Sequence, residues 1–269
     1  MGSEMCIRDR VIAVSRSGET AETLEALRRA RGAGGYTALI SIAGKSRGRE
    51  LVDTYIYVDA GVERSIVMTK SFVAMSLAGL VLTSGMSQRL GASYAVPRRS
   101  LEEFRRFAEE VVAKKKAVEL GRRFAERSIY RFVFLGAGPG YPVALEASLK
   151  LKETSYAATE ALHALEFRHG PMATVGEEQL IIVINQRGAG YSYVERLWRE
   201  LVERGAQVLR LAESVEESGK NLGLPDTGCE EVTALAAILH LQLFAVGFAT
   251  ALGRNPDAPR NLVRFVKKF

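Results

Sequence analysis

Short apolar runs and longer amphipathic stretches alternate along the first third of the chain. Residues 11–14 form an apolar run typical of a buried strand, and residues 20–31 place leucine and alanine side chains on one helical face. Strand-like runs follow at 37–42 and 55–58, and a long apolar helix is predicted over 69–90. This order of strands and helices predicts a parallel sheet with crossover helices.

A second pattern of the same kind starts beyond Pro97. Ser100 and Glu103 have the spacing of a capping box, which predicts the start of a charged helix that runs to about residue 127. Two α/β halves that each end in a long buried helix indicate an internal duplication, with ligands expected at the carboxyl ends of the strands. The further strands are predicted at 132–135, 180–185 and 208–211, and the further helices at 141–154, 191–204 and 232–252.

The pattern divides the chain into four parts. Residues 1–10 have neither a helical nor a strand period, and we expect them to be a non-native segment. Residues 11–97 are predicted to form a first subdomain, 98–127 a connecting helix, and 128–269 a second subdomain with a C-terminal tail. The first subdomain lacks the strand and glycine turn that open the second. It is therefore predicted to be incomplete at its N-terminus by a βα segment of roughly 30–50 residues.

Composition is that of an ordinary globular protein, with 47% hydrophobic and 25% charged residues. The net charge of +6 suits anionic small molecules but is too diffuse to indicate nucleic acid. Cys6 and Cys229 give neither a disulfide framework nor a metal-binding pattern, so no metal is expected and a reducing cytoplasm fits. The apolar stretch 232–252 contains His240 and Gln242, which favours a buried helix over a membrane span.

The most informative motif is Ser-Arg-Ser-Gly-Glu-Thr at residues 15–20, between a predicted strand and a predicted helix. Backbone N–H groups at a helix start favour an anion, and Gly18 lets the chain approach a ligand closely. Hydroxyl groups and one arginine add further donors. A plain helix cap, without a ligand, remains an equal alternative on these residues alone. The candidate phosphate-binding residues are Ser15, Arg16, Ser17 and Thr20.

Residues 136–140, Gly-Ala-Gly-Pro-Gly, also lie between a strand and a helix. Pro139 and Pro142 disturb the spacing of a dinucleotide fingerprint, and the expected acidic residue after the next strand is not evident. A structural turn near a ligand is the favoured interpretation, and no cofactor is expected.

The following helix carries Glu146, Lys150 and Glu153, whose spacings of four and three residues place them on one helix face. A surface row of ion pairs is the common explanation for such spacing. The apolar residues around it indicate contact with protein, where a carboxylate beside a lysine can serve as a general base. Further along, His169 lies in a polar loop that ends in Gly-Pro, where a histidine can titrate near neutral pH, although on these residues alone a loop histidine without a role is the favoured interpretation.

Taken together, these segments resemble the sugar isomerase (SIS) family. Within it, they are similar to the isomerase half of glucosamine-fructose-6-phosphate aminotransferase and to stand-alone sugar-phosphate deaminases and ketose–aldose isomerases. The resemblance covers nearly all of residues 11–266. The matching stretches are SRSGETAETLEALRRA, AGVERSIVMTKSF, GAGPGYPVALEASLKLKETSY, ALEFRHGP and APRNLV.

The resemblance implies two tandem SIS subdomains, each a flavodoxin-like three-layer sandwich with a parallel sheet flanked by helices. It implies that Glu153 moves a proton between C1 and C2 of a phosphosugar and that Lys150 assists it. His169 would help to open the sugar ring and would come from the partner subunit of a homodimer. The tail around residues 261–264 would close over the sugar. Phosphate and sugar contacts would come from Ser15, Arg16, Ser17, Thr20, Ser65, Ile66 and Arg264.

The chain also departs from the aminotransferase pattern. Arg264 stands where that enzyme has a Schiff-base lysine, and a guanidinium stays protonated, so this route is closed at this position. Ser65 and Met68 are more similar to the stand-alone branch. We therefore expect a cytoplasmic, cofactor-free enzyme that converts glucosamine 6-phosphate to fructose 6-phosphate and ammonia, without membrane or nucleic-acid partners. The alternatives are the isomerase half of an aminotransferase and a non-catalytic phosphosugar-binding module.

Overall fold

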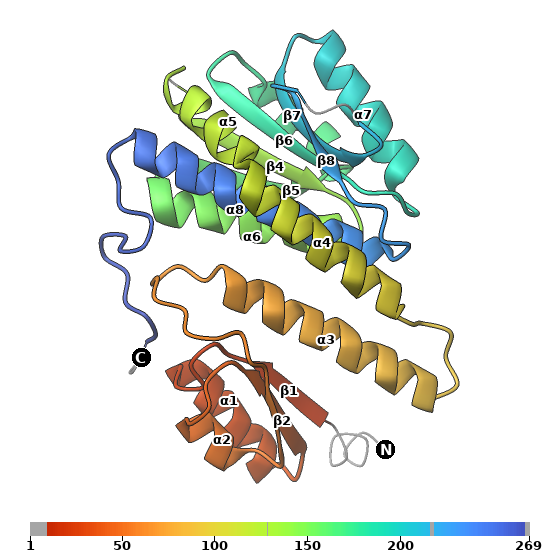
Figure 1. The fold of residues 1–269 in the computed structure, drawn as a ribbon, viewed down its shortest axis with the longest axis vertical. Coiled ribbons are helices and arrows are strands. Elements are labelled where there is room, and N and C mark those ends of the chain that lie inside the picture. Colours follow the sequence, from red (N-terminus) through yellow and green to blue (C-terminus); the bar gives the residue numbers. More distant parts are fainter. Residues whose placement is uncertain (1–9, 128, 216–217, 267–269) are drawn as a thin grey trace. The chain divides into compact units, whose positions relative to one another are not determined.

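The computed structural model describes residues 10–127, 129–215 and 218–266. The chain divides into two compact units (Figure 1). Unit 1 comprises the described residues of 1–95 and 260–269, and unit 2 comprises those of 96–259. The C-terminal segment, expected with the second subdomain, thus groups with unit 1. The charged helical region, expected as a connection, groups with unit 2.

Unit 1 is built on a three-stranded parallel sheet in the order β1-β2-β3. Its strands are β1 (Arg10–Val14), β2 (Tyr36–Ser41) and β3 (Thr54–Tyr57), and its helices are α1 (Ala21–Gly32), α2 (Arg47–Leu51) and α3 (Lys70–Arg89). Helices α1 and α2 lie on one face, where Leu24, Leu27 and Leu39 are buried. Helix α3 runs along the other face of the sheet (Figure 1).

Helix α3 is less buried than its apolar sequence predicts. Val81, Met86 and Leu90 are exposed, and only 28% of the most apolar 18-residue stretch of the helix is buried. A pocket of ≈ 350 Å³ lies between its last turns and the sheet, with Ile12 and Ile56 in its wall. Ile12 and Val14 of β1 are exposed as well, whereas every residue of the central strand β6 in unit 2 is buried.

Unit 2 is a larger three-layer α/β sandwich with the sheet order β5-β4-β6-β7-β8, all parallel. Its strands are β4 (Arg131–Gly136), β5 (Ala158–His163), β6 (Gln179–Asn185), β7 (Gln207–Glu213) and β8 (Asn221–Leu224). Its helices are α4 (Arg98–Lys114), α5 (Lys116–Ala125), α6 (Gly140–Ser155), α7 (Tyr191–Glu203) and α8 (Glu230–Ala251), with short 3₁₀ turns η2 (Glu166–Arg168) and η3 (Pro171–Thr174). The edge strands β5 and β8 were not predicted.

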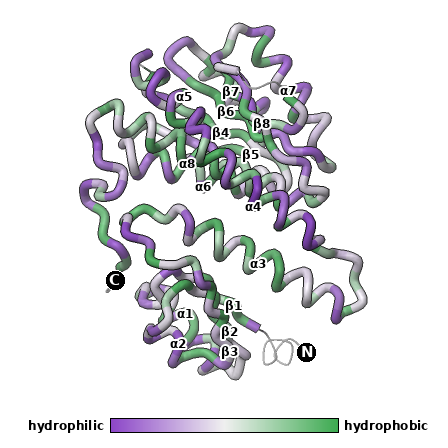
Figure 2. The backbone as a smooth tube through the Cα atoms, in the orientation of Figure 1, coloured by the Kyte–Doolittle hydropathy of each residue, from purple (hydrophilic) through white to green (hydrophobic). Residues whose placement is uncertain are grey.

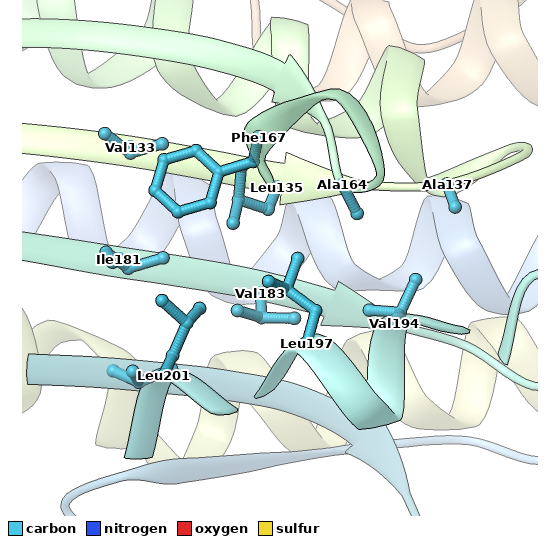
Figure 3. Packing of buried hydrophobic residues seen from close by; sticks show 11 residues of the cluster. Val133, Leu135, Ala137, Ala164, Phe167, Ile181, Val183, Val194, Leu197 and Leu201 are labelled. Atoms are coloured by element: carbon cyan, nitrogen blue, oxygen red, sulfur yellow. The ribbon is translucent and has the colours of Figure 1, made fainter. Parts of the chain in front are cut away.

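Alternating side chains of the central strands of unit 2 fill two cores. Val133, Leu135 and Ile181 point to the face covered by α7, where they meet Leu197 and Phe167 (Figure 3). On the other face, Phe132 packs edge-on against Phe248 of α8, with ring centroids 5.0 Å apart. This alternation produces the predicted layered fold, because successive strand residues face opposite sides.

Helix α8 forms the centre of the helical layer beside α4, α5 and α6. It is largely apolar (Figure 2), and 78% of its most apolar 18-residue stretch is buried inside the protein. His240 is buried and contacts Phe107 and the Gly223 carbonyl. The prediction of a buried helix at this position is therefore confirmed for the protein as described.

The expected capping box at Ser100 is wrong. Helix α4 begins at Arg98, directly after Pro97, and the buried Ser100 hydroxyl instead donates to the Thr227 carbonyl at 2.7 Å. The single long helix predicted here is also interrupted, because Lys115 adopts a left-handed conformation (φ 52°) between α4 and α5.

Candidate functional site

The Ser-Arg-Ser-Gly-Glu-Thr segment, here called the cradle loop (residues 15–20), links β1 to α1 at the carboxyl edge of the sheet of unit 1. Its serines fold the loop on itself: Ser15 Oγ accepts the Gly18 N–H and Ser17 Oγ accepts the Glu19 N–H, both at 3.1 Å. Gly18 has a φ of 64°, which favours glycine. Thr20 is the N-cap of α1, yet its side chain makes no capping bond. The helix therefore does not use this hydroxyl, and Thr20 lies in the wall of an adjoining pocket.

A pocket of ≈ 460 Å³ opens beside the cradle loop. One part of its wall is made of hydroxyl groups and the other of apolar side chains from the segment before α3 and from α3 itself. Such a wall suits a ligand with a polar anionic end. The lining residues are Val14, Ser15, Arg16, Ser17, Thr20, Thr23, Met68, Phe72, Met75, Ser76, Gly79 and Arg264.

Arg16 was expected to bind phosphate, but its partners among the described residues are groups of the protein itself. Its side chain is buried, and Nη1 lies 3.2 Å from Glu63 Oε2 in an ion pair. Nη1 also donates to the Ser65 and Ile66 carbonyls at 3.3 and 2.9 Å, and Nη2 donates to the Arg264 carbonyl at 2.7 Å. Both terminal nitrogens are thus committed to the protein itself.

Glu63 is the buried carboxylate at the centre of this network, and it is not among the site residues expected from the sequence. Oε1 accepts the N–H groups of Thr69 and Ser71 at the start of α3, and Oε2 accepts the Ser71 hydroxyl at 2.5 Å. Burial raises the pKa of Glu63, but these hydrogen bonds and Arg16 outweigh it, so the pKa lies below its ordinary value. The only sequence signal was an acidic residue shortly before an apolar helix.

Ser65 and Ile66 contribute through their main chain, since their carbonyls receive Arg16. The Ser65 hydroxyl accepts the Val67 N–H at 3.1 Å. Arg264 is exposed at the surface and lines the pocket beside the cradle loop. Its Nη2 donates to the Glu63 carbonyl at 2.5 Å. All seven expected binding residues therefore lie in unit 1, around the cradle loop and the Arg16–Glu63 pair.

The three charged residues on α6 form a compact row in unit 2. Lys150 is buried, and its Nζ lies 2.6 Å from Glu153 Oε2 and 3.4 Å from Glu146 Oε1. Glu153 Oε2 is itself buried and, among the described residues, receives no regular hydrogen bond besides this ion pair. A carboxylate oxygen held beside one ammonium, with lone pairs unused, can accept a proton from a substrate.

Glu146 has a strongly perturbed titration. Burial raises its pKa to about 6, although the charge and hydrogen bond of Lys150 act in the opposite direction, and the Glu153 carboxylate adds to the rise. This carboxyl group therefore changes protonation close to neutral pH.

His169 follows η2 and is exposed, and its backbone N–H donates to the Glu166 carbonyl at 2.9 Å. Within the described part of the chain its ring makes no hydrogen bond or ion pair. Its neighbour Arg168 pairs with Glu200 at 3.0 Å. His163 packs against the ring of Tyr141 instead.

The glycine turn after β4 serves the protein's own backbone. A Cβ at Gly136 would overlap the Gly140 carbonyl at the start of α6, and one at Gly140 would overlap the Gln186 side chain. The turn thus brings its backbone into close contact with the start of α6, and its expected closeness to a ligand stays a prediction. No group of three metal-ligating side chains is present in the described ranges.

Residues 127–222, which lie within the bounds of unit 2, match the family model described as "SIS domain". The chain contains a SIS domain. It is 35% identical over 270 residues to glutamine–fructose-6-phosphate aminotransferase of Mycolicibacterium smegmatis, covering 95% of this chain and 42% of the relative. The enzyme of the same name from Thermus thermophilus is 34% identical over 269 residues, covering 96% and 44%. The SIS chain thus spans less than half the length of these curated relatives.

Several solved structures share its fold. The C-terminal domain of the Francisella tularensis glucosamine-fructose-6-phosphate aminotransferase aligns with a TM-score of 0.85 at 24% identity, covering 93% of this chain and 72% of that one. Glucosamine-6-phosphate deaminase from Thermotoga maritima aligns with a TM-score of 0.71 at 25% identity, covering 96% and 75%. The expected fold and the homology to part of the aminotransferases are confirmed.

Proposed function

We propose that this SIS protein is a phosphosugar isomerase that deaminates glucosamine 6-phosphate to fructose 6-phosphate and ammonia. The observation that carries the proposal is the Lys150–Glu153 pair, a carboxylate with unused lone pairs beside a buried ammonium. The cradle loop, with its unused Thr20 hydroxyl and the adjoining pocket, supports phosphate binding. The name of the Thermotoga relative supports the choice of substrate.

In the proposed reaction, Glu153 removes the proton from C2 of the open-chain aldose, and O1 takes up a proton from water to give the enolamine. Glu153 then returns its proton to C1, and the C2 nitrogen, now an iminium, gives up a proton to water and becomes an imine. Water hydrolyses this imine to the ketone with release of ammonia. Lys150 holds Glu153 in place through their ion pair, with Nζ 2.6 Å from Oε2. Ring opening is assigned to His169 of the partner subunit in a homodimer, as the family resemblance implies. The reaction needs no cofactor, and a cytoplasmic enzyme fits it.

The test is ammonia release from glucosamine 6-phosphate by the purified protein, followed together with fructose 6-phosphate formation. Equal rates of both products support deamination. Aldose–ketose interconversion without ammonia release would show that the protein is an isomerase that does not deaminate its substrate. Substrate binding without any turnover would mean a non-catalytic phosphosugar-binding module.

A second candidate is the isomerase half of a glutamine-dependent aminotransferase. The 34–35% identity to curated aminotransferases more than twice as long as the matched region favours it. The discriminating observation is the gene sequence upstream of residue 11, where a glutaminase with an N-terminal cysteine nucleophile would decide for this candidate.

A further inference from the structure

Arg16 connects three segments that are far apart in the sequence. Its guanidinium pairs with the Glu63 carboxylate, binds the carbonyls of Ser65 and Ile66, and donates to the carbonyl of Arg264, 248 residues away. The side chain is 7% exposed. A planar guanidinium presents several donors in fixed directions, which is why one arginine can satisfy acceptors from separate segments.

The C-terminal segment 260–266 reaches the cradle loop region by two further contacts. Arg264 Nη2 donates to the Glu63 carbonyl at 2.5 Å. The Val266 carbonyl accepts the N–H of Ala21, the first residue of α1, at 3.0 Å. The segment is therefore bound both to the Arg16–Glu63 pair and to the helix start that follows the cradle loop.

Unit 2 contains a corresponding loop before α7, but the side chain that stands in the place of Arg16 makes no contact with a distant C-terminal segment among the described residues. Gly188 lies three residues before α7, as Gly18 lies three residues before α1. Gln186, two residues before that glycine, donates from Nε2 to Glu230 at the start of α8 and to the Ala137 carbonyl, each at 3.1 Å. The amide thus links its loop to a carboxylate near the long helix, as Arg16 does. The guanidinium adds donors beyond this shared contact, and one of them reaches the C-terminal segment.

We propose that Arg16 is a positioning residue that holds segment 260–266 against the cradle loop. It acts on a bound phosphosugar only through that segment, which presents Arg264 to the pocket. The proposal rests on the proposed function for the identity of the ligand, but the contact itself does not depend on turnover. Nη1 and Nη2 already donate to protein carbonyls, so a direct phosphate contact by Arg16 would have to use the second N–H of Nη2 or the Nε–H.

The Ala21 amide reports on this contact, because its acceptor is Val266 and Arg16 does not touch it. The Leu24 amide, bonded to the Thr20 carbonyl, is the internal reference for α1. In Arg16→Gln, which copies Gln186, we expect the Ala21 amide of the ligand-free protein to exchange roughly tenfold faster or more, since hydrogen bonds to charged groups contribute that much to an equilibrium. The exchange of Leu24 should stay within about twofold, and so should both amides in the exposed control Arg29→Gln.

Two further measurements separate this role from alternatives. Titration with inorganic phosphate should give an affinity within about threefold of wild type, because the hydroxyl groups of the loop are intact. A loss of phosphate affinity with unchanged Ala21 exchange would overturn the proposal and make Arg16 a phosphate ligand. If Arg16→Gln fails to fold, Arg16→Lys retains a charge beside Glu63 but lacks the guanidinium geometry, and it should show the same selective change at Ala21. Unchanged Ala21 exchange in a folded Lys variant would also overturn the proposal. Failure of the proposed function alone, without turnover of any phosphosugar, would leave the exchange result standing.

Discussion

Lys150 Nζ and Glu153 Oε2 lie 2.6 Å apart on consecutive turns of α6, with the lysine buried and the carboxylate partly open to solvent. The ion pair holds the Glu153 carboxylate in place, and among the described residues Oε2 receives no regular hydrogen bond besides it. If Glu153 is the base, Glu153→Gln should lower kcat by roughly 10²–10⁴-fold with little change in the unfolding temperature. Glu160→Gln, exposed on β5, is the matched control. Turnover of the Glu153 variant within tenfold of wild type would remove Glu153 from the mechanism.

Glu146 should make stability depend on pH in the acid range. Its pKa is raised to about 6 by burial, so the folded state binds more protons than the unfolded state between pH about 4.5 and 6. The stability of wild type should therefore fall relative to Glu146→Gln as pH rises through this window, by about 2 kcal/mol in total. Urea unfolding of both proteins at several pH values measures the difference. A constant difference from pH about 4 to 7 would mean that the pKa is not raised.

Glu63 should show the opposite dependence. Its lowered folded pKa gives stability that is present above the unfolded pKa and is lost as pH falls through the folded value. Glu63→Gln leaves Arg16 buried without its ion partner and should cost roughly 3 kcal/mol at pH about 7, with a smaller cost in acid. Glu25→Gln, which removes an exposed pair with Arg29, should have a far smaller effect. Similar losses for the two variants would contradict a buried role for Glu63.

A substitution at Thr20 should affect substrate binding without affecting stability. Because its side chain makes no capping bond to α1, Thr20→Ala should leave the unfolding temperature almost unchanged. If the hydroxyl binds phosphate, KM for the phosphosugar should rise about tenfold, as expected for a lost hydrogen bond to a charged group. A drop in stability without a change in KM would identify Thr20 as a helix cap only.

The α5–α8 contact depends on two glycines that approach the opposite backbone. A Cβ at Gly247 would overlap the Val118 carbonyl, and one at Gly121 would overlap the Phe244 carbonyl. Each alanine variant should lose about 1–3 kcal/mol of stability, because backbone atoms cannot move aside cheaply. Gly85→Ala in α3, where no atom lies within 4 Å of the added Cβ, should be neutral or stabilising. Thermal unfolding of the three variants tests the contrast, and equal effects would refute it.

Several parts of the fold were predictable because they depend on neighbouring residues. The main strands and helices followed from hydrophobic period, and the cradle loop followed from serine and glycine between a strand and a helix. The edge strands β5 and β8 were not predicted because polar residues such as Glu160 and Asn221 interrupt their apolar pattern. The capping box failed because Pro97 starts α4 earlier and a distant carbonyl, that of Thr227, takes the Ser100 hydroxyl.

The candidate site also has parts that local sequence determines and parts that depend on tertiary contacts. The sequence by itself determined the row on α6, since residues three and four apart in a helix must lie on one face. It also placed hydroxyl groups at the start of α1. Only the tertiary structure decided what Arg16 does, because its partners Glu63 and Arg264 lie 47 and 248 residues away and meet it only when unit 1 is folded. Local spacing specifies which side chains are available, and long-range packing determines which of them are already satisfied by the protein.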